Sequence, residues 1–270
     1  MATIDLSSRT FFRLTGPDAR RYLNGQVTQE VSQLEEGEVT YTFVCDLKGR
    51  IQSDAYIRAL PAGDLLIDAP SSARESLLAR LDRYLIADDC ELIDETGKWQ
   101  LLHHLEEASG PGQVSRFGSQ GRDEIRPAGE PTLSAPSLSG DEAENLRIRA
   151  GIPTLQDLEG LFPAESGQIE RAVSFAKGCY QGQEVISRMK RAGKTNKTLA
   201  TVSLDERPEA LPLTFSEPDG KKPVLTLTSV TSDTTGGCHA GLGSFSTKAN
   251  LEHELVAENG LRARVTKRLN

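Results

Sequence analysis

Alternating apolar positions near the start of the chain predict a β-hairpin. Val39, Tyr41, Phe43 and Cys45 are separated by single residues, so their side chains share one face and predict a half-buried strand over 38–46. A turn sequence follows at 46–49, and 50–60 is the expected partner strand. The pattern therefore indicates two neighbouring strands joined by a tight turn.

Two helices are predicted from capping residues and leucine spacing. The first covers 16–25, with Pro17 in its first turn and Gly25 at its end. The second begins at Ser72 and Glu75, whose spacing is that of a capping box. Its apolar face consists of Leu77, Leu78, Leu81 and Leu85.

The remaining apolar segments predict an α+β unit, a linker and an all-β end. Further strands are expected at 65–69, 90–94 and 99–105. Residues 46–126 thus form an α+β unit, and the proline-rich stretch 126–140 is a surface linker. A helix over 141–150 is closed by Gly151. Short strands separated by Pro and Gly then predict a small β-barrel or sandwich, at 199–204, 224–230, 242–245, 255–256 and 261–265.

Charge and composition exclude several classes of protein. Asp and Glu number 39 against 31 Lys and Arg, and the resulting net charge of −8 argues against a general nucleic-acid coat. No apolar run approaches the roughly 20 residues of a membrane helix, and the first residues lack the apolar core of a signal peptide. The four cysteines and four histidines show no metal-ligand spacing. We therefore expect a cytoplasmic protein with no membrane contact and no bound metal.

The segment 177–184, KGCYQGQE, concentrates the residues with special chemistry. Gly178 and Gly182 flank Cys179 and Tyr180, and an apolar pair follows, which predicts a tight loop that enters a helix. The free backbone N–H groups of such a helix start can bind an anion or a carbonyl group. The helix start and Lys177 would both favour the reactive thiolate of Cys179. The alternative is a small buried side chain in a turn.

A run of cations with no acidic residue among them follows this loop. One interpretation is a solvated helix end, where cations suit the helix dipole. The other is an anion site for a polycarboxylate tail, a phosphate or an RNA backbone. The run consists of Arg188, Lys190, Arg191, Lys194 and Lys197.

Five segments resemble the motifs of one protein family. Residues 23–31 are similar to its LxGQxTxDV segment, and 46–50 to its DxKGR turn. Residues 147–153 and 162–165 are similar to its RIxxGIP and FxPxE segments, and 177–184 match its KGCYxGQE signature. The chain thus resembles, over nearly its whole length, the YgfZ group of folate-binding proteins, which are relatives of the glycine-cleavage T-protein, an aminomethyltransferase.

The resemblance implies an α+β fold of the aminomethyltransferase type. Such a fold is a three-domain ring with a central folate pocket and a C-terminal β-barrel. The first domain would be discontinuous, built from 1–45 and 127–197 and carrying the KGCYxGQE loop. The α+β unit at 46–126 would be the second domain, and the barrel at 198–270 the third.

Two departures from the transferase pattern concern its carboxylates. The Asp-Asp pair of the T-protein relatives aligns with Gln52 and Ser53, and Asp54 lies one step further, on the opposite face of a strand. The glutamate that holds the pterin is replaced by Arg149, which only donates hydrogen bonds. Both changes count against glycine-cleavage chemistry, and enzymatic turnover is left open.

Three alternative functions follow, two from the resemblance and one, ranked last, from the cationic run. The first is a folate-dependent factor for iron–sulfur cluster assembly or repair, with Cys179 as the working residue and client enzymes that include a tRNA-thiomethylating one. The second is a one-carbon transferase that uses Asp54 or Asp68. The third is an RNA-binding module that uses the cationic run, although the chain is only 5% aromatic. A monomer is expected.

Tetrahydrofolate or a derivative is the expected ligand. The candidate folate-binding residues are Asp54, Arg149, Glu165, Lys177, Gly178, Tyr180, Gly182, Gln183, Glu184 and Arg188. The neighbouring histidines His103 and His104 are expected on opposite faces of one strand.

Overall fold

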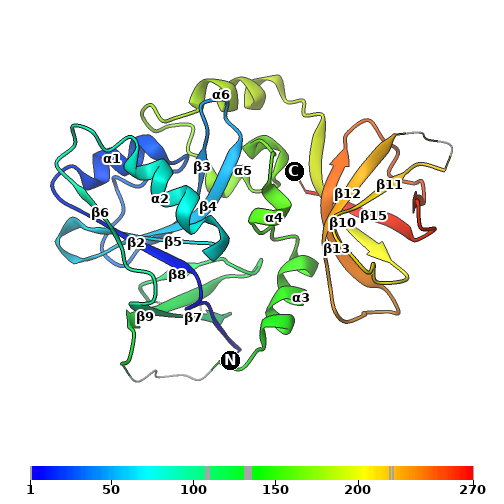
Figure 1. Ribbon diagram of the computed structural model, residues 1–270, viewed down its shortest axis with the longest axis horizontal. Coiled ribbons are helices and arrows are strands. Elements are labelled where there is room, and N and C mark those ends of the chain that lie inside the picture. Colours follow the sequence, from blue (N-terminus) through cyan, green and yellow to red (C-terminus); the bar gives the residue numbers. More distant parts are fainter. Residues whose placement is uncertain (1, 107–109, 131–135, 219, 221, 270) are drawn as a thin grey trace. The chain divides into compact units, whose positions relative to one another are not determined.

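The computed structural model describes residues 2–106, 110–130, 136–218, 220 and 222–269 (Figure 1). The chain forms two compact units, each with its own sheet structure. The first unit comprises 1–139 and 170–187, and the second comprises 140–169 and 188–270. The three-domain division implied by the resemblance stays a prediction.

The first unit is built on a five-stranded antiparallel sheet with the strand order β3-β4-β5-β2-β6. The strands β3 and β4 pair along their length, so the predicted hairpin is confirmed. The strands are β2 (Thr10–Thr15), β3 (Val39–Cys45), β4 (Ile51–Ala59), β5 (Leu65–Ala69) and β6 (Glu91–Asp94).

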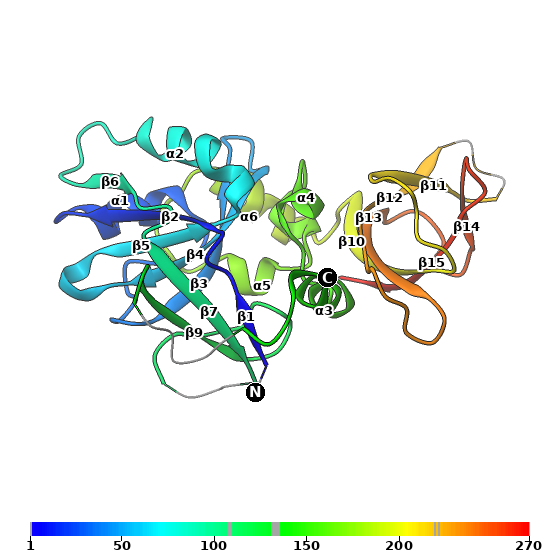
Figure 2. The same ribbon diagram turned by 60° about the horizontal axis from the view of Figure 1, so that its bottom comes forward.

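A four-stranded antiparallel sheet packs against the five-stranded sheet, with the order β1-β7-β9-β8. In Figures 1 and 2 it lies on the face opposite the helix α2. Two layers of sheet and a helix thus enclose the core of this unit. The elements are β1 (Thr3–Asp5), β7 (Trp99–Leu105), β8 (Gln113–Val114), β9 (Gly121–Pro127), α1 (Ala19–Gln26), a 3-10 turn (Pro61–Gly63) and α2 (Arg74–Asp82).

Three local predictions in this unit are wrong. Gly25 lies inside α1, which ends one residue later. Residues Ser71–Ala73 form a 3-10 turn before α2, so Ala73 takes the N-cap position and no capping box forms. The last five residues of β3 are all buried, because both faces of its sheet are covered. The strands β8 and β9 were not predicted.

The second unit ends in a closed six-stranded antiparallel barrel, which confirms the predicted C-terminal barrel. Its strand order is β10-β13-β12-β11-β14-β15, and Phe215, Leu227 and Phe245 are fully buried in its core. The strand β11 was not predicted. The strands are β10 (Lys197–Leu204), β11 (Leu213–Ser216), β12 (Pro223–Val230), β13 (His239–Ser246), β14 (Leu255–Ala257) and β15 (Arg262–Arg268).

Short helices complete the fold. The buried Arg147 gives a structural reason for part of the 147–153 motif. Arg147 donates to the Ile152 carbonyl, to Asp157 at 2.9 Å and to the Ser229 hydroxyl, so it ties two helices to the barrel. Gly151 closes its helix with φ of +72°, as predicted. The helices are α3 (Gly140–Ala150), α4 (Leu155–Leu158), a 3-10 turn (Pro163–Glu165), α5 (Ile169–Ala172) and α6 (Gln183–Ala192).

Candidate functional site

A buried lysine fastens the 177–184 loop to the last turn of α1 and the segment that follows it. The Lys177 ammonium donates to the backbone carbonyls of Asn24 at 2.7 Å, Val27 at 3.0 Å and Gln29 at 2.6 Å. An ammonium has three N–H groups, so these acceptors use all of them. Burial lowers the pKa of Lys177 to about 8, and the nearby Glu30 carboxylate opposes this shift. Lys177 therefore joins two of the sequence motifs.

Further hydrogen bonds run along the same pair of segments. On the C-terminal side of Lys177, the Gln181 N–H donates to the Gly25 carbonyl at 3.1 Å. On the other side, the Ser174 N–H donates to the Thr28 carbonyl, and the Thr28 hydroxyl donates to the Ala172 carbonyl at 2.6 Å. The loop is thus held on both sides of residues 178–180.

Gly182 lets the loop cross the turn between β3 and β4 at very short distance. Its φ is +82°, and a Cβ there would lie 2.8 Å from the Asp46 carbonyl oxygen and 3.0 Å from the Gly49 Cα. The helix α6 begins at Gln183, as the glycine pattern predicted. Glu184 is exposed at this helix start. The motifs at 46–50 and 177–184 therefore form one contact.

The fastened loop exposes Cys179 and buries Tyr180. Cys179 is exposed, which excludes the alternative of a small buried side chain, and Gly178 before it is exposed as well. Tyr180 is buried, its hydroxyl has no hydrogen-bond partner among the described residues, and burial raises its pKa to about 12. Arg80 of α2 donates to Gln181 and to the carbonyl of Cys45, so it links the loop to α2 and to the end of β3.

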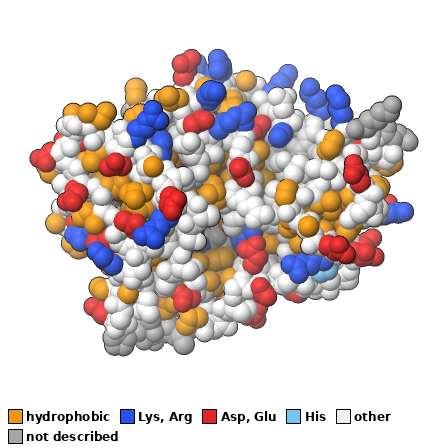
Figure 3. All heavy atoms as spheres, viewed as in Figure 1, with side chains coloured by type: hydrophobic (Ala, Val, Ile, Leu, Met, Phe, Trp, Pro, Cys, Tyr) orange, Lys and Arg blue, Asp and Glu red, His pale blue; other side chains and the backbone are white. Residues whose placement is uncertain are grey.

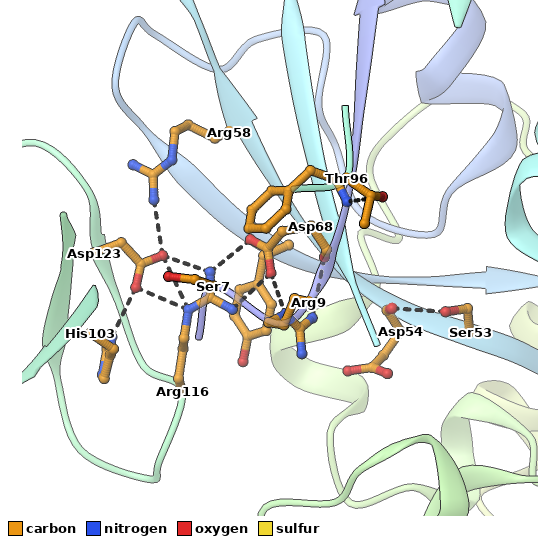
Figure 4. A network of polar contacts seen from close by, with 12 residues as sticks. Ser7, Arg9, Ser53, Asp54, Arg58, Asp68, Thr96, His103, Arg116 and Asp123 are labelled. Atoms are coloured by element: carbon orange, nitrogen blue, oxygen red, sulfur yellow. Dashed lines mark hydrogen bonds and ion pairs between the residues drawn. The ribbon is translucent and has the colours of Figure 1, made fainter. Parts of the chain in front are cut away.

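A buried network of ion pairs lies elsewhere in the first unit (Figure 4). Arg116, in the loop between β8 and β9, donates to both carboxylate oxygens of Asp123 and of Asp68. Arg58 of β4 donates to Asp123 at 2.9 Å, and Arg9 donates to Asp68 at 2.6 Å. The network joins the two sheets, because Asp68 lies on β5 and Asp123 on β9.

The arginines keep both aspartates of the network ionised. Burial alone would raise the pKa of Asp123, but Arg116, His103 and Arg58 hold it below its usual value. Burial opposes ionisation of Asp68 as well, and the nearby guanidinium groups still hold its pKa below the usual value. His103 and His104 point to opposite faces of β7, as predicted, and pair with Asp123 and Glu124 of β9. Each carboxylate oxygen of Asp68 and Asp123 thus accepts a hydrogen bond from an arginine, and Asp123 also pairs with the imidazole of His103.

Asp54 lies beside this network and differs from its aspartates. Its side chain is buried, and its Oδ1 atom has no hydrogen-bond partner among the described residues. Figure 4 shows a single contact at this residue, between its backbone carbonyl and the Ser53 hydroxyl. Burial raises the pKa of the Asp54 carboxyl, and Arg9 and Arg171 partly oppose the shift. Asp54 therefore keeps an acceptor that no described group of this chain uses.

Two more buried polar atoms without a hydrogen-bond partner belong to residues that interact electrostatically with Asp54. The Tyr41 hydroxyl and the Arg171 Nε are buried without a hydrogen-bond partner among the described residues. The Arg171 guanidinium lies 4.0 Å from the centre of the Tyr41 ring, and it donates to the hydroxyl of Tyr56 at 3.2 Å. Tyr41 and Tyr56 are paired across β3 and β4, two positions from Asp54 and its partner Phe43 and therefore on the same face of the sheet. We call Tyr41, Asp54 and Arg171 the polar cluster.

Buried polar groups normally have a partner, so three such atoms in one cluster are groups that a polar ligand or water would satisfy. Sequence analysis singled out Asp54 alone. It placed Tyr41 on the correct strand face but attached no function to it, and Arg171 gave no signal. The sequence predicts the hairpin but not its register, and it is the register that brings Tyr41 and Asp54 to the same face of the sheet.

The other predicted site residues lie in the second unit. Glu165 is buried and accepts the Phe162 N–H, which closes a 3-10 turn. Arg149 pairs with Asp233 at 2.9 Å, and both side chains are partly exposed. Arg188 is exposed on α6. Within the described part of the chain, no group of three His, Cys, Asp or Glu side chains is placed to hold a metal ion. None of the helices described is long and apolar enough to cross a membrane.

Comparison with known proteins confirms the resemblance found in the motifs. Residues 1–104 match the family described as the GCVT N-terminal domain. An uncharacterized protein of Haemophilus influenzae is 28% identical over 214 residues, which are 77% of this chain and 75% of that protein. The tRNA-modifying protein YgfZ of Cronobacter sakazakii is 27% identical over 237 residues, 74% of this chain and 70% of that protein.

A solved structure shows the same fold. The glycine cleavage system aminomethyltransferase T of Bartonella henselae superposes with a TM-score of 0.77 over 98% of this chain and 85% of that protein, at 14% identity. The mixed α+β architecture with a C-terminal barrel is therefore that of the aminomethyltransferase, as the motifs predicted.

Proposed function

We propose that this protein binds tetrahydrofolate or a related reduced folate, and that it supports iron–sulfur cluster assembly or repair in client enzymes, including one that modifies tRNA. The observation that carries the proposal is the buried Asp54 carboxylate with an unpartnered oxygen. The similarity to proteins named tRNA-modifying protein YgfZ supports a tRNA-modifying enzyme as one of the clients. The three-domain division belongs to the same proposal.

The polar cluster fits the pterin ring of a folate. A pterin presents neighbouring N–H donors on one edge, and a carboxylate is an acceptor-only group that can take both. Asp54 would hold this edge, while the hydroxyl of Tyr41 and the Nε of Arg171 are free to pair with the polar atoms of the ring. When bound, a reduced folate supplies a carrier for one-carbon units. The residues of this chain would orient it and exclude water.

Cys179 is the second part of the proposal. Its thiol is exposed at the top of a loop that Lys177 and the Gln181 backbone hold in place, so it can meet another protein or a cluster atom without reorganisation. A rigid loop limits the entropy lost when the thiol is engaged. Lys177 would act as a positioning residue, since its N–H groups are used by carbonyls.

The ligand part is tested by calorimetric titration with tetrahydrofolate under reducing conditions. Asp54→Asn replaces an acceptor pair with one acceptor and a donor, so the affinity should fall about 10- to 100-fold, the value of a hydrogen bond to a charged group. Asp82→Asn, on the exposed side of α2, is the matched control and should bind as the wild type does. Equal binding by Asp54→Asn would contradict the assignment of the polar cluster.

The thiol part is tested in cells that lack this gene. We expect the wild-type chain to restore the activity of iron–sulfur enzymes and the level of thiomethylated tRNA, and Cys179→Ala to fail. Cys90→Ala is the control, because Cys90 is only half-buried and lies outside the loop. Full activity with Cys179→Ala would remove the thiol from the mechanism while leaving the folate proposal intact.

A one-carbon transferase is the second candidate, and Asp54 rather than Asp68 is the residue that we propose as its general base. Asp68 is ion-paired with Arg9 and Arg116 and has no free acceptor, whereas Asp54 has one and a raised pKa. A general base needs a free lone pair within reach of the substrate. Formation of 5,10-methylenetetrahydrofolate from tetrahydrofolate and an aminomethyl donor, lost in Asp54→Asn, would support this candidate.

A further inference from the structure

The second unit carries a group of cations that neither the fold nor the polar cluster uses. No Asp or Glu occurs between residues 185 and 204, although the whole chain has a net charge of −8. Arg188 and Arg191 lie on the last turns of α6, Lys194 lies between α6 and β10, and Lys197 is the first residue of β10. All four side chains are exposed.

A fifth cation joins this group through tertiary structure. The Thr247 N–H donates to the Asn196 carbonyl at 3.0 Å, and its hydroxyl donates to the Thr195 carbonyl at 2.5 Å. These bonds place the turn after β13 against the segment between α6 and β10, and the exposed Lys248 belongs to this turn. We define the basic surface as Arg188, Arg191, Lys194, Lys197 and Lys248.

The basic surface has no internal counter-charge. Among the described residues, none of its five side chains forms an ion pair with a carboxylate. Figure 3 shows Lys and Arg side chains gathered over α6 and the start of β10. Like charges placed together repel each other, and they raise the local concentration of anions instead. Such a surface fits a partner that supplies several negative charges.

The chemistry of the surface favours a phosphate backbone over an acidic protein. Protein interfaces are depleted in Lys and depend on aromatic or apolar anchors. The exposed large apolar side chains of the described chain are Leu47, Ile86, Phe175 and Leu251; none lies in 185–204, which holds four of the five cations, and Leu251 is three residues from the fifth, Lys248. Clustered Lys and Arg without such anchors are typical of sites that bind phosphates and release counterions.

We propose that the basic surface binds the sugar–phosphate backbone of structured RNA. No aromatic residue occurs between Tyr180, which is buried, and Phe215, so this segment offers no aromatic platform for stacking unpaired bases. Double-stranded RNA is recognised through its shape and its phosphates, which suits a surface of Lys and Arg. The inference does not depend on folate, and it assigns a substrate-facing surface to the proposed role in tRNA modification.

The test is fluorescence anisotropy with a labelled RNA hairpin, without folate, over a range of salt concentrations. With about five phosphate contacts, the affinity should fall by roughly 10²- to 10³-fold between about 50 and 200 mM salt. Arg191→Gln alone should weaken binding and reduce the slope of log affinity against log salt by about 1. A single-stranded RNA of the same length should bind more weakly than the hairpin.

The matched control removes four charges elsewhere. The variant R188Q/R191Q/K194Q/K197Q should reduce the salt slope to about −1, and a variant with Lys98, Arg207, Lys222 and Lys267 replaced by Gln should bind the hairpin as the wild type does. Equal loss in both variants would show a nonspecific charge effect and overturn the proposal. A salt slope no steeper than about −1 for the wild type would overturn it too. Folate titration of the same variants keeps this outcome separate from the ligand proposal.

Discussion

Lys177 is the residue on which the candidate loop depends most, because one ammonium holds three carbonyls from another segment. Lys177→Met keeps the length of the side chain but leaves those carbonyls without their donor. Each unsatisfied acceptor in a buried place is costly, so we expect a loss of about 2–4 kcal/mol in the free energy of unfolding. Urea unfolding followed by circular dichroism measures it. Lys98→Met, on an exposed turn, should change little.

The raised pKa of Asp54 predicts that the affinity for tetrahydrofolate depends on pH. Its folded-state pKa is raised, chiefly by burial, so at acidic pH part of the protein carries a neutral carboxyl. Pterin N–H donors pair with the ionised form, so the affinity for tetrahydrofolate should rise with pH until Asp54 is fully ionised, by up to tenfold per pH unit below its pKa. Titrations in buffers of different ionisation enthalpy should show proton release on binding. Asp54→Asn should show neither effect.

At the scale of elements, the contact between two turns depends on glycine. Gly182→Ala forces a Cβ against the Asp46 carbonyl and the Gly49 Cα at a positive φ. We expect a loss of roughly 2–4 kcal/mol, from backbone strain and from the steric contact together. Gly63→Ala is the matched control, because its φ of +88° imposes the same strain while no atom lies within 4 Å of the added Cβ. If thermal unfolding showed equal losses of stability for Gly182→Ala and Gly63→Ala, the close contact between the two turns would contribute nothing to the effect.

The elements that the sequence pattern predicted are those whose partners are local. The alternation in 38–46 predicted β3, and the turn predicted its partner β4, because a hairpin is specified by neighbouring residues. The burial of both faces of β3 was missed, since the second covering sheet comes from residues far along the chain. The capping box failed for a related reason, because a 3-10 turn displaced the helix start.

Only part of the candidate site could be predicted from the sequence. The loop at 177–184 could be recognised, because glycines on both sides of a cysteine have a local meaning. The polar cluster could not, because Arg171 lies more than 100 residues from Asp54 and has no pattern of its own. Arg116 and Asp123 lie within ten residues of each other, and charged residues at that spacing are ordinarily solvent-exposed. Only tertiary structure reveals that both are buried.

At the scale of the whole first unit, the ion-pair network joins its two sheets. Arg116→Met would leave Asp68 and Asp123 buried with fewer cations, and removing one partner of a buried pair costs about 3–5 kcal/mol. Arg74→Met removes an ion pair of the same type, between Arg74 and Asp94, at a half-exposed site. That change should cost less than about 1 kcal/mol. Urea unfolding of both variants at neutral pH tests the contrast.

The same network predicts how the whole molecule responds to acid. The folded pKa of Asp123 is lowered from 3.8, so its ion pairs stabilise the fold above that pH, and this contribution is lost as the pH falls through the folded value. The folded pKa of His103 is lowered from 6.5, mainly by burial, so protonation of the unfolded chain also favours unfolding below that pH. Stability should therefore decrease as the pH falls from 6.5.

Asp123→Asn separates this effect from general acid unfolding. The amide cannot titrate, so the difference in unfolding free energy between wild type and variant should be largest at neutral pH and should shrink as the pH falls below 3.8. Asp82→Asn, at an exposed position, should leave the whole pH curve unchanged. A difference that stays constant down to about pH 3 would show that Asp123 acts through packing, and that the charges of its arginine partners are balanced by other groups.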